Sequence, residues 1–195
     1  MTGPAPAEYG WWLASRAAGL TALLCITLAV GVGLALGGKV GSKKPGLPRV
    51  LVAVHEHAAL AGLIAIAVHG ITLLGDGWLK PSIADVAVPF ASDVEPFWVG
   101  LGTTGGWFAA LLGLTFYARK RIGTRLWRKA HRATIVAYVL SVAHTLGAGT
   151  DAEEPWLQAF LLATAAPILF LFLMRVLPRE SPAVATAGSR RPSRT

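Results

Sequence analysis

The chain has 195 residues, of which 54% are hydrophobic and 14% are charged, with a formal net charge of +8. Soluble domains carry about 25% charged residues, so this composition excludes an ordinary water-soluble domain and favours a protein embedded in lipid. The single cysteine, Cys25, excludes a disulfide framework and a thiolate metal cluster. The positive charge alone would suit nucleic-acid binding, so its distribution along the chain is needed to decide between nucleic-acid binding and membrane topology.

Five apolar stretches are long enough to cross a bilayer as helices, since about 20 helical residues span its roughly 30 Å hydrocarbon core. They are predicted near residues 11–36, 50–74, 97–117, 135–146 extended back to about 127, and 156–177. Six of the tryptophans fall at or near the ends of these stretches, where amphipathic rings favour the headgroup level. The sequence therefore predicts an all-α polytopic membrane helix bundle with about five transmembrane helices.

Basic and acidic residues alternate from one predicted loop to the next. The first loop, the third loop and the C-terminal tail contain four, seven and five basic residues, whereas the second and fourth loops are acidic and contain one lysine, Lys80. Because Lys and Arg concentrate on the cytoplasmic side, this pattern predicts an N-outside, C-inside orientation in the cell membrane. The excess positive charge is thus interpreted as topology, and no nucleic-acid partner is expected.

Composition divides the chain into three regions: an extracytoplasmic segment at 1–10, a membrane domain at 11–177 and a basic cytoplasmic tail at 178–195, expected to be disordered. No basic residue precedes the first apolar run, which is longer than a signal-peptide core, so a retained helix is expected there. The second loop contains an apolar piece at 83–91 that could lie on the membrane surface or cap a site.

All five histidines lie on the second and fourth predicted helices, and four of them form two spaced pairs: His55 with His69, and His131 with His144. Ionisable side chains at membrane depth are costly and usually functional. Their steps of 14 and 13 residues correspond to rises of about 21 Å and 19.5 Å along a helix. Since both helices run outward, His55 and His131 share an inner level, and His69 and His144 share an outer level.

The angular positions are less regular than the depths. In ideal helices, the side chains of His55 and His69 would point about 40° apart around the helix axis, and those of His131 and His144 about 140° apart. A kink in the fourth helix, or ligands that approach from different sides, would absorb this mismatch. Imidazoles at two matched depths fit two bis-imidazole haem b groups stacked across the membrane, because iron takes two axial nitrogens and the porphyrin edge is apolar.

Haem propionates need cationic partners, and basic residues are present at both levels. Arg16 lies inside the first helix near the depth of His69, where pairing with a propionate competes with simple snorkelling to the interface. Four basic residues flank the inner pair: Arg49, Arg128, Lys129 and Arg132. The cofactor-binding set predicted from these positions is His55, His69, His131, His144, Arg16 and Arg132, with the four histidines as iron ligands.

Other interpretations of these positions remain open. His57 is expected to pack or to support a neighbouring imidazole, and Glu56 could carry a proton, bind an imidazole or pair with an arginine. The small residues around the histidines suit either the wall of a flat cofactor or close helix packing. An alternative function is a divalent metal-ion transporter or sensor that uses His55, Glu56 and His57; another is a non-catalytic membrane scaffold.

These residues resemble the ferric reductase-like transmembrane domain, which is shared by ferric reductases, NADPH oxidases and the haem-binding membrane subunit of the bacterial methionine sulfoxide reductase system. The resemblance covers about residues 10–177 and rests on six features: the spacing of His55 and His69, the spacing of His131 and His144, Arg16-Ala-Ala-Gly, Leu126-Trp-Arg-Lys-Ala-His, Val88-Pro-Phe-Ala-Ser and Gly147-Ala-Gly-Thr-Asp.

The resemblance implies a bis-histidine b-type cytochrome in which His55 and His131 hold the inner haem, and His69 and His144 the outer one. Electrons would pass from a cytoplasmic or quinol donor to an extracytoplasmic acceptor. No flavin or NAD(P)H domain is expected after Pro178. The donor is therefore expected to be a quinone pool or a partner's flavin, and the chain the haem-binding electron-transfer subunit of an oxidoreductase system.

Overall fold

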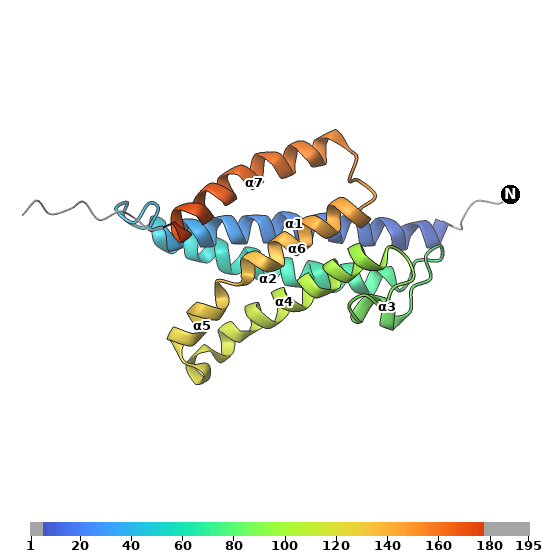
Figure 1. The fold of residues 1–195 in the computed structure, drawn as a ribbon, viewed down its shortest axis with the longest axis horizontal. Coiled ribbons are helices and arrows are strands. Elements are labelled where there is room, and N and C mark those ends of the chain that lie inside the picture. The colour runs from blue at the N-terminus through green and yellow to red at the C-terminus, as the bar shows by residue number, and fades with distance from the viewer. Residues whose placement is uncertain (1–5, 178–195) are drawn as a thin grey trace, which may run out of the picture.

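A computed structural model describes residues 6–177, and its regular secondary structure is entirely helical (Figure 1). Its helices are α1 (Pro6–Gly37), α2 (Leu47–Leu73), α3 (Ile83–Ala87), α4 (Pro96–Ile122), α5 (Thr124–His131), α6 (Thr134–Ala148) and α7 (Pro155–Val176). The predicted all-α fold is therefore confirmed. The predicted tail at 178–195 and the first half of the predicted N-terminal segment lie outside the described residues.

Local sequence signals set several helix boundaries. Helices α2, α4 and α7 each have a proline in the first turn, where the missing N–H has no helical partner to lose. Helix α4 ends at Ile122 and is followed by Gly123, whose φ of 93° is in a region that glycine adopts without strain. Helix α3 begins with a capping box formed by Ser82 and Asp85.

Four helices of residues 6–177 are long and apolar enough to cross a membrane: α1, α2, α4 and α7. Many of their large apolar side chains face outward; Ile64, Leu111 and Leu162 are 57%, 63% and 74% exposed. Apolar surface on this scale is stable where lipid surrounds the helices. The chain is therefore a multi-pass membrane protein, as its composition predicts.

The fourth predicted span is two helices joined by a turn. Helix α5 ends at His131 and α6 begins at Thr134, so the prediction of one continuous helix from about residue 127 was wrong. The Thr134 hydroxyl donates a hydrogen bond of 2.8 Å to the His131 carbonyl and so competes with the helical ladder at this point. The 15 residues of α6 rise about 22 Å, less than the roughly 30 Å hydrocarbon core.

The helices form two closely packed pairs, α1 with α2 and α4 with α6. In α2, Gly62 lies against α1, and a Cβ built on it would be 3.3 Å from Cys25 and Ile26; Ala58 and Ala65 are buried nearby. In α4, a Cβ on Gly105 would be 3.1 Å from a side-chain atom of α6. These small residues allow close helix packing at both interfaces.

Helices α1, α2 and α4, the α5–α6 segment and α7 alternate in direction along the chain (Figure 1). The C-terminal ends of α1 and α7 meet where Gly37 contacts Arg175, and Arg16 near the other end of α1 contacts Asp151 in the α6–α7 connection. The basic connections α1–α2 and α4–α5 thus gather at one end of the bundle, and the acidic connections at the other. From α4, the Trp107 indole donates a hydrogen bond of 2.8 Å to the Ala87 carbonyl and so fastens α3, in the α2–α4 connection, to α4.

Candidate functional site

The four spaced histidines meet as two pairs, named here by their predicted levels. In the inner pair, His55 of α2 and His131 of α5 have ring centres 5.9 Å apart and planes at 89°. In the outer pair, His69 of α2 and His144 of α6 have ring centres 6.3 Å apart and planes at 69°. Helix α2 does not pack closely against α5 or α6 in the described part of the chain. The histidine side chains therefore meet at a distance from the backbones of these helices.

The break between α5 and α6 directly follows His131. It changes the direction of the chain between His131 and His144. In an unbroken helix, these two side chains would point about 140° apart around the helix axis. The break thus allows both rings to face α2. The sequence left two explanations for the angular mismatch, a kink in the fourth helix or ligands that approach from different sides. The structure contains a kink.

Helix α1 holds the two histidines of α2 through backbone carbonyls. The Nδ1 atom of His69 donates to the Ser15 carbonyl at 2.8 Å, and the Ser15 hydroxyl lies 3.1 Å from the same nitrogen. The Nδ1 atom of His55 donates to the Ala29 carbonyl at 2.8 Å. Since a carbonyl can only accept, Nδ1 carries the proton in the neutral form of either ring, and this tautomer leaves Nε2 as an acceptor or ligand.

Glycines make room for these contacts. A Cβ on Gly19 would lie 3.1 Å from the His69 ring, and one on Gly33 would lie 3.1 Å from the His55 ring. The two glycines are 14 residues apart in α1, the same step as between the two histidines in α2. This matched spacing was visible in the sequence, and sequence reasoning missed it.

Helix α4 plays the same part for His144. Its Trp98 carbonyl accepts a hydrogen bond of 3.0 Å from the Nδ1 atom of His144, and a Cβ on Gly102 would lie 2.5 Å from that ring. Three of the four rings therefore have Nδ1 bound to a carbonyl. Histidines that ligate metals are typically oriented in this way, because the hydrogen bond fixes the tautomer and strengthens the free nitrogen as a donor.

His131 is held differently. Its Nδ1 is buried and has no hydrogen-bond partner within residues 6–177. Its ring instead stacks on Trp127, with ring centres 5.0 Å apart and planes at 24°. Trp127 in turn contacts Phe116 of α4, with ring centres 5.8 Å apart.

The ring separations suit a metal ion between the two imidazoles of each pair. A metal–nitrogen bond of about 2.0 Å and about 1.2 Å from nitrogen to ring centre put opposed ring centres about 6.4 Å apart. The observed 5.9 Å and 6.3 Å are close to this value. Directly packed aromatic rings have similar separations, so the Nδ1 hydrogen bonds, which leave Nε2 free, are the more discriminating feature.

Arg16 lies one residue from the Ser15 that binds His69, and it has a partner that the sequence reasoning did not predict. Its Nε donates to Oδ2 of Asp151 at 2.8 Å, and its Nη2 contacts Oδ1, so the pair is bidentate. Asp151 is 5% exposed, whereas the Arg16 side chain is 37% exposed and retains an accessible side. The guanidinium also lies 5.3 Å from the centre of a Trp12 ring.

The remaining predicted residues lie apart from the rings. Arg132 is exposed and follows His131 at the end of α5. Glu56 and His57 are exposed, and the Nδ1 atom of His57 donates to the Ala53 carbonyl of its own helix at 2.7 Å. The part of the chain that the structure describes holds no group of three or more His, Cys, Asp or Glu side chains arranged to bind a metal ion.

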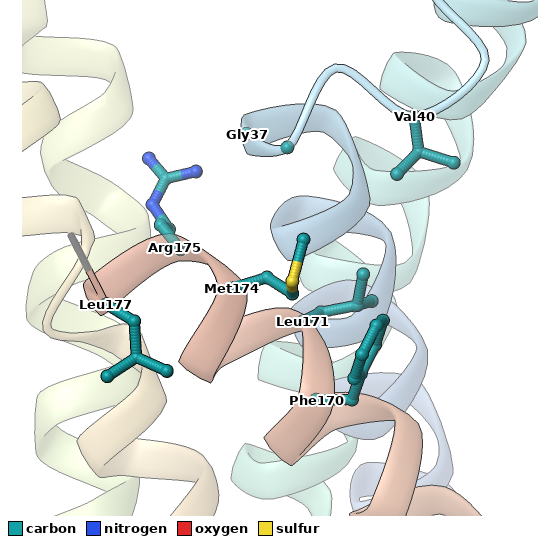
Figure 2. A pocket seen from close by; sticks show the side chains of 8 residues that line it. Gly37, Val40, Phe170, Leu171, Met174, Arg175 and Leu177 are labelled. Carbon is teal, nitrogen blue, oxygen red and sulfur yellow. The ribbon is translucent and has the colours of Figure 1, made fainter. Parts of the chain in front are cut away.

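A cavity lies elsewhere, between the C-terminal ends of α1 and α7 (Figure 2). It has a volume of about 450 Å³, and its lining includes Gly37, Phe170, Met174 and Arg175. A smaller cavity of about 200 Å³ separates α1 from the first turns of α7. None of the four paired histidines lines either cavity, so both are distinct from the histidine sites.

No family model, curated protein or solved structure matches this chain. The class is therefore defined by the fold and the site alone. It is a membrane helix bundle with four candidate spans in residues 6–177, in which two pairs of histidines face one another at two levels.

Proposed function

We propose that the chain is a bis-histidine b-type cytochrome of the ferric reductase-like kind, which transfers electrons across the membrane. The observation that supports this most directly is the geometry of His55, His69 and His144. Each is anchored at Nδ1 by a carbonyl, and each belongs to a pair whose separation suits a metal between two nitrogens. Paired neutral imidazoles among apolar helices are the ligand set of low-spin haem b.

The chain's residues have separable roles in this proposal. The four histidines supply two axial nitrogens at each level, and the carbonyls of α1 and α4 orient three of them. Arg16 and Arg132 are the cations proposed for propionates at the outer and inner levels. When bound, haem b supplies a one-electron couple at each level. Because both axial positions would be occupied by histidine, the chain acts as a conduit and leaves bond-making to its partners.

Five membrane passes complete the proposal, with α5 and α6 together forming the fourth. The gathering of basic connections at one end and acidic connections at the other supports this topology. With the basic end in the cytoplasm, the N-terminus is outside and residue 177 is inside. Electrons then enter the inner pair from a flavoprotein or quinol and leave the outer pair for an extracytoplasmic acceptor.

The proposal is tested by expressing the full chain with supplemented haem, purifying it and measuring reduced-minus-oxidised spectra with haem quantification per polypeptide. We expect two low-spin b-type haems per chain. The matched control is His57→Ala, because His57 is exposed and bonds to its own helix; this variant should retain both haems. A well-folded protein without haem bands would overturn the proposal, and stoichiometric divalent-metal binding in that protein would favour the transporter alternative.

A further inference from the structure

The inner histidine pair is asymmetric. His55 is anchored by the Ala29 carbonyl, whereas the Nδ1 atom of His131 is buried without a partner in the described part of the chain. The closest aromatic contact of His131 is Trp127, which stacks on it at 5.0 Å. We propose that Trp127 is a positioning residue of His131, whose ring it holds by stacking. This inference rests on the proposed haem function.

Helix geometry explains why these two rings meet. Trp127 precedes His131 by four residues in α5, so the two side chains lie on one face of that helix. Stacking with planes at 24° restricts rotation of the imidazole about its side-chain bonds, as a hydrogen bond at Nδ1 would. A freely rotating ring would have to lose this freedom when it binds iron, which would weaken the ligand.

Trp127 is itself fixed by aromatic packing. Its Nε1 atom is buried and has no hydrogen-bond partner in residues 6–177, so no hydrogen bond of its own sets the indole. Phe116 contacts the indole at 5.8 Å with planes at 62°, and the Arg119 guanidinium lies 3.7 Å over the Phe116 ring. We call Arg119, Phe116 and Trp127 the inner aromatic cluster. Through it, the end of α4 sets the orientation of a ring on α5.

A different explanation for Trp127 is anchoring at the membrane interface, where tryptophans are common. The two roles predict different results. An interfacial anchor affects insertion and overall stability, whereas a positioning residue affects the iron ligated by His131 and leaves the outer site unchanged. The angle between axial imidazole planes governs the anisotropy of the low-spin ferric electron paramagnetic resonance signal, so that signal reports on the ring that Trp127 is proposed to hold.

The experiment compares Trp127→Leu and Trp127→Phe in full-length protein. Leucine fills part of the volume without a ring face, and phenylalanine restores a ring for stacking. Trp78→Leu is the matched control, because Trp78 is 84% exposed in the α2–α4 connection. The measurements are haem content, a potentiometric titration and the low-spin resonance signal, each in the otherwise unchanged protein and in a His69→Ala background that retains the inner site alone.

We expect Trp127→Leu to bind the inner haem about 10- to 100-fold more weakly, the range typical for loss of a group that orients a metal ligand. Its resonance signal and midpoint potential should shift for one component only. Trp127→Phe should restore most of the binding, and Trp78→Leu should match the parent. Unchanged inner-haem binding and spectra in Trp127→Leu would overturn the positioning role, as would equal loss of both haems. Absence of haem from the parent protein would instead overturn the proposed function.

Discussion

The outer and inner histidine pairs have matching spacing but different support. In the outer pair, His69 and His144 are both held by carbonyls, from α1 and α4 respectively. In the inner pair, only His55 has such a bond, and His131 depends on a stacked tryptophan. The outer pair is therefore fixed by backbone atoms that no side-chain substitution removes, whereas half of the inner pair depends on one side chain.

The difference arises from what α4 presents at each level. Near the outer pair, Gly102 lets the His144 ring approach the α4 backbone closely enough to reach a carbonyl. Near the inner pair, α4 presents Phe116, which packs on Trp127. At this level, aromatic packing from α4 supports the His131 ring through Trp127. Close backbone contact needs glycine at the contact point, and aromatic packing needs a ring.

The largest expected effect comes from replacing the ligands themselves. Alanine at His69 or His144 should abolish the outer haem and leave the inner one, and alanine at His55 or His131 should do the reverse, because each pair is a separate site. Haem per polypeptide and resolved redox titrations measure this outcome. Equal loss of both haems in every variant would show that the two pairs do not act as independent sites.

Substitution of glycine should affect the pairs unequally. Gly102→Ala would place a methyl group against the His144 ring, and overpacking of this kind typically costs about 1–3 kcal/mol, equivalent to roughly 5- to 160-fold weaker outer-haem binding. The methyl group of Gly33→Ala would lie 3.1 Å from the His55 ring, farther than the 2.5 Å at Gly102, so inner-haem binding should be weakened less. Gly106→Ala is the control, because its Cβ would lie 3.4 Å from Ile66 in ordinary contact. Haem titration of the apoprotein ranks the three variants, and a Gly106→Ala effect equal to that of Gly102→Ala would contradict the ranking.

Arg16 and Asp151 distinguish a structural ion pair from a cofactor contact at the outer level. Both Arg16→Gln and Asp151→Asn break the bidentate pair, so both should lower the melting temperature by several degrees. If Arg16 also binds a propionate, outer-haem affinity falls in Arg16→Gln and is retained in Asp151→Asn, where the guanidinium is still present. Thermal unfolding and haem titration separate these effects. Equal outer-haem affinity in the two variants would assign Arg16 to the ion pair alone.

The smallest effect is expected for Ser15→Ala. The substitution removes the hydroxyl 3.1 Å from the His69 ring but leaves the Ser15 carbonyl that accepts the 2.8 Å hydrogen bond. One neutral hydrogen bond contributes about 0.5–1.5 kcal/mol, so outer-haem affinity should fall by at most about tenfold. Competition titration with a haem-binding apoprotein measures this change. A complete loss of the outer haem would mean that the hydroxyl, and not the carbonyl, orients His69.

Much of the fold could be predicted because it depends on local periodicity and composition. Apolar runs of membrane length predicted the long helices to within a few residues at most ends, and the rise of a helix predicted that His55 would meet His131 and His69 would meet His144. The break after His131 could not be placed, because the Thr134 hydroxyl bond that accompanies it is a choice between two local hydrogen-bonding patterns.

By itself, the sequence determined that the chain is a helical membrane protein and that the paired histidines lie at matched depths. Of the five predicted spans, four are long apolar helices of residues 6–177, and the other is divided between α5 and α6. These properties depend on residues close together in the chain and on the solvent that surrounds them. Only the tertiary structure decided which nitrogen is free in His55, His69 and His144, which helix supports each of these rings and which acid binds Arg16. Those contacts join residues 26, 46, 54 and 135 positions apart, and no local pattern specifies them because each depends on how helices distant in sequence pack together.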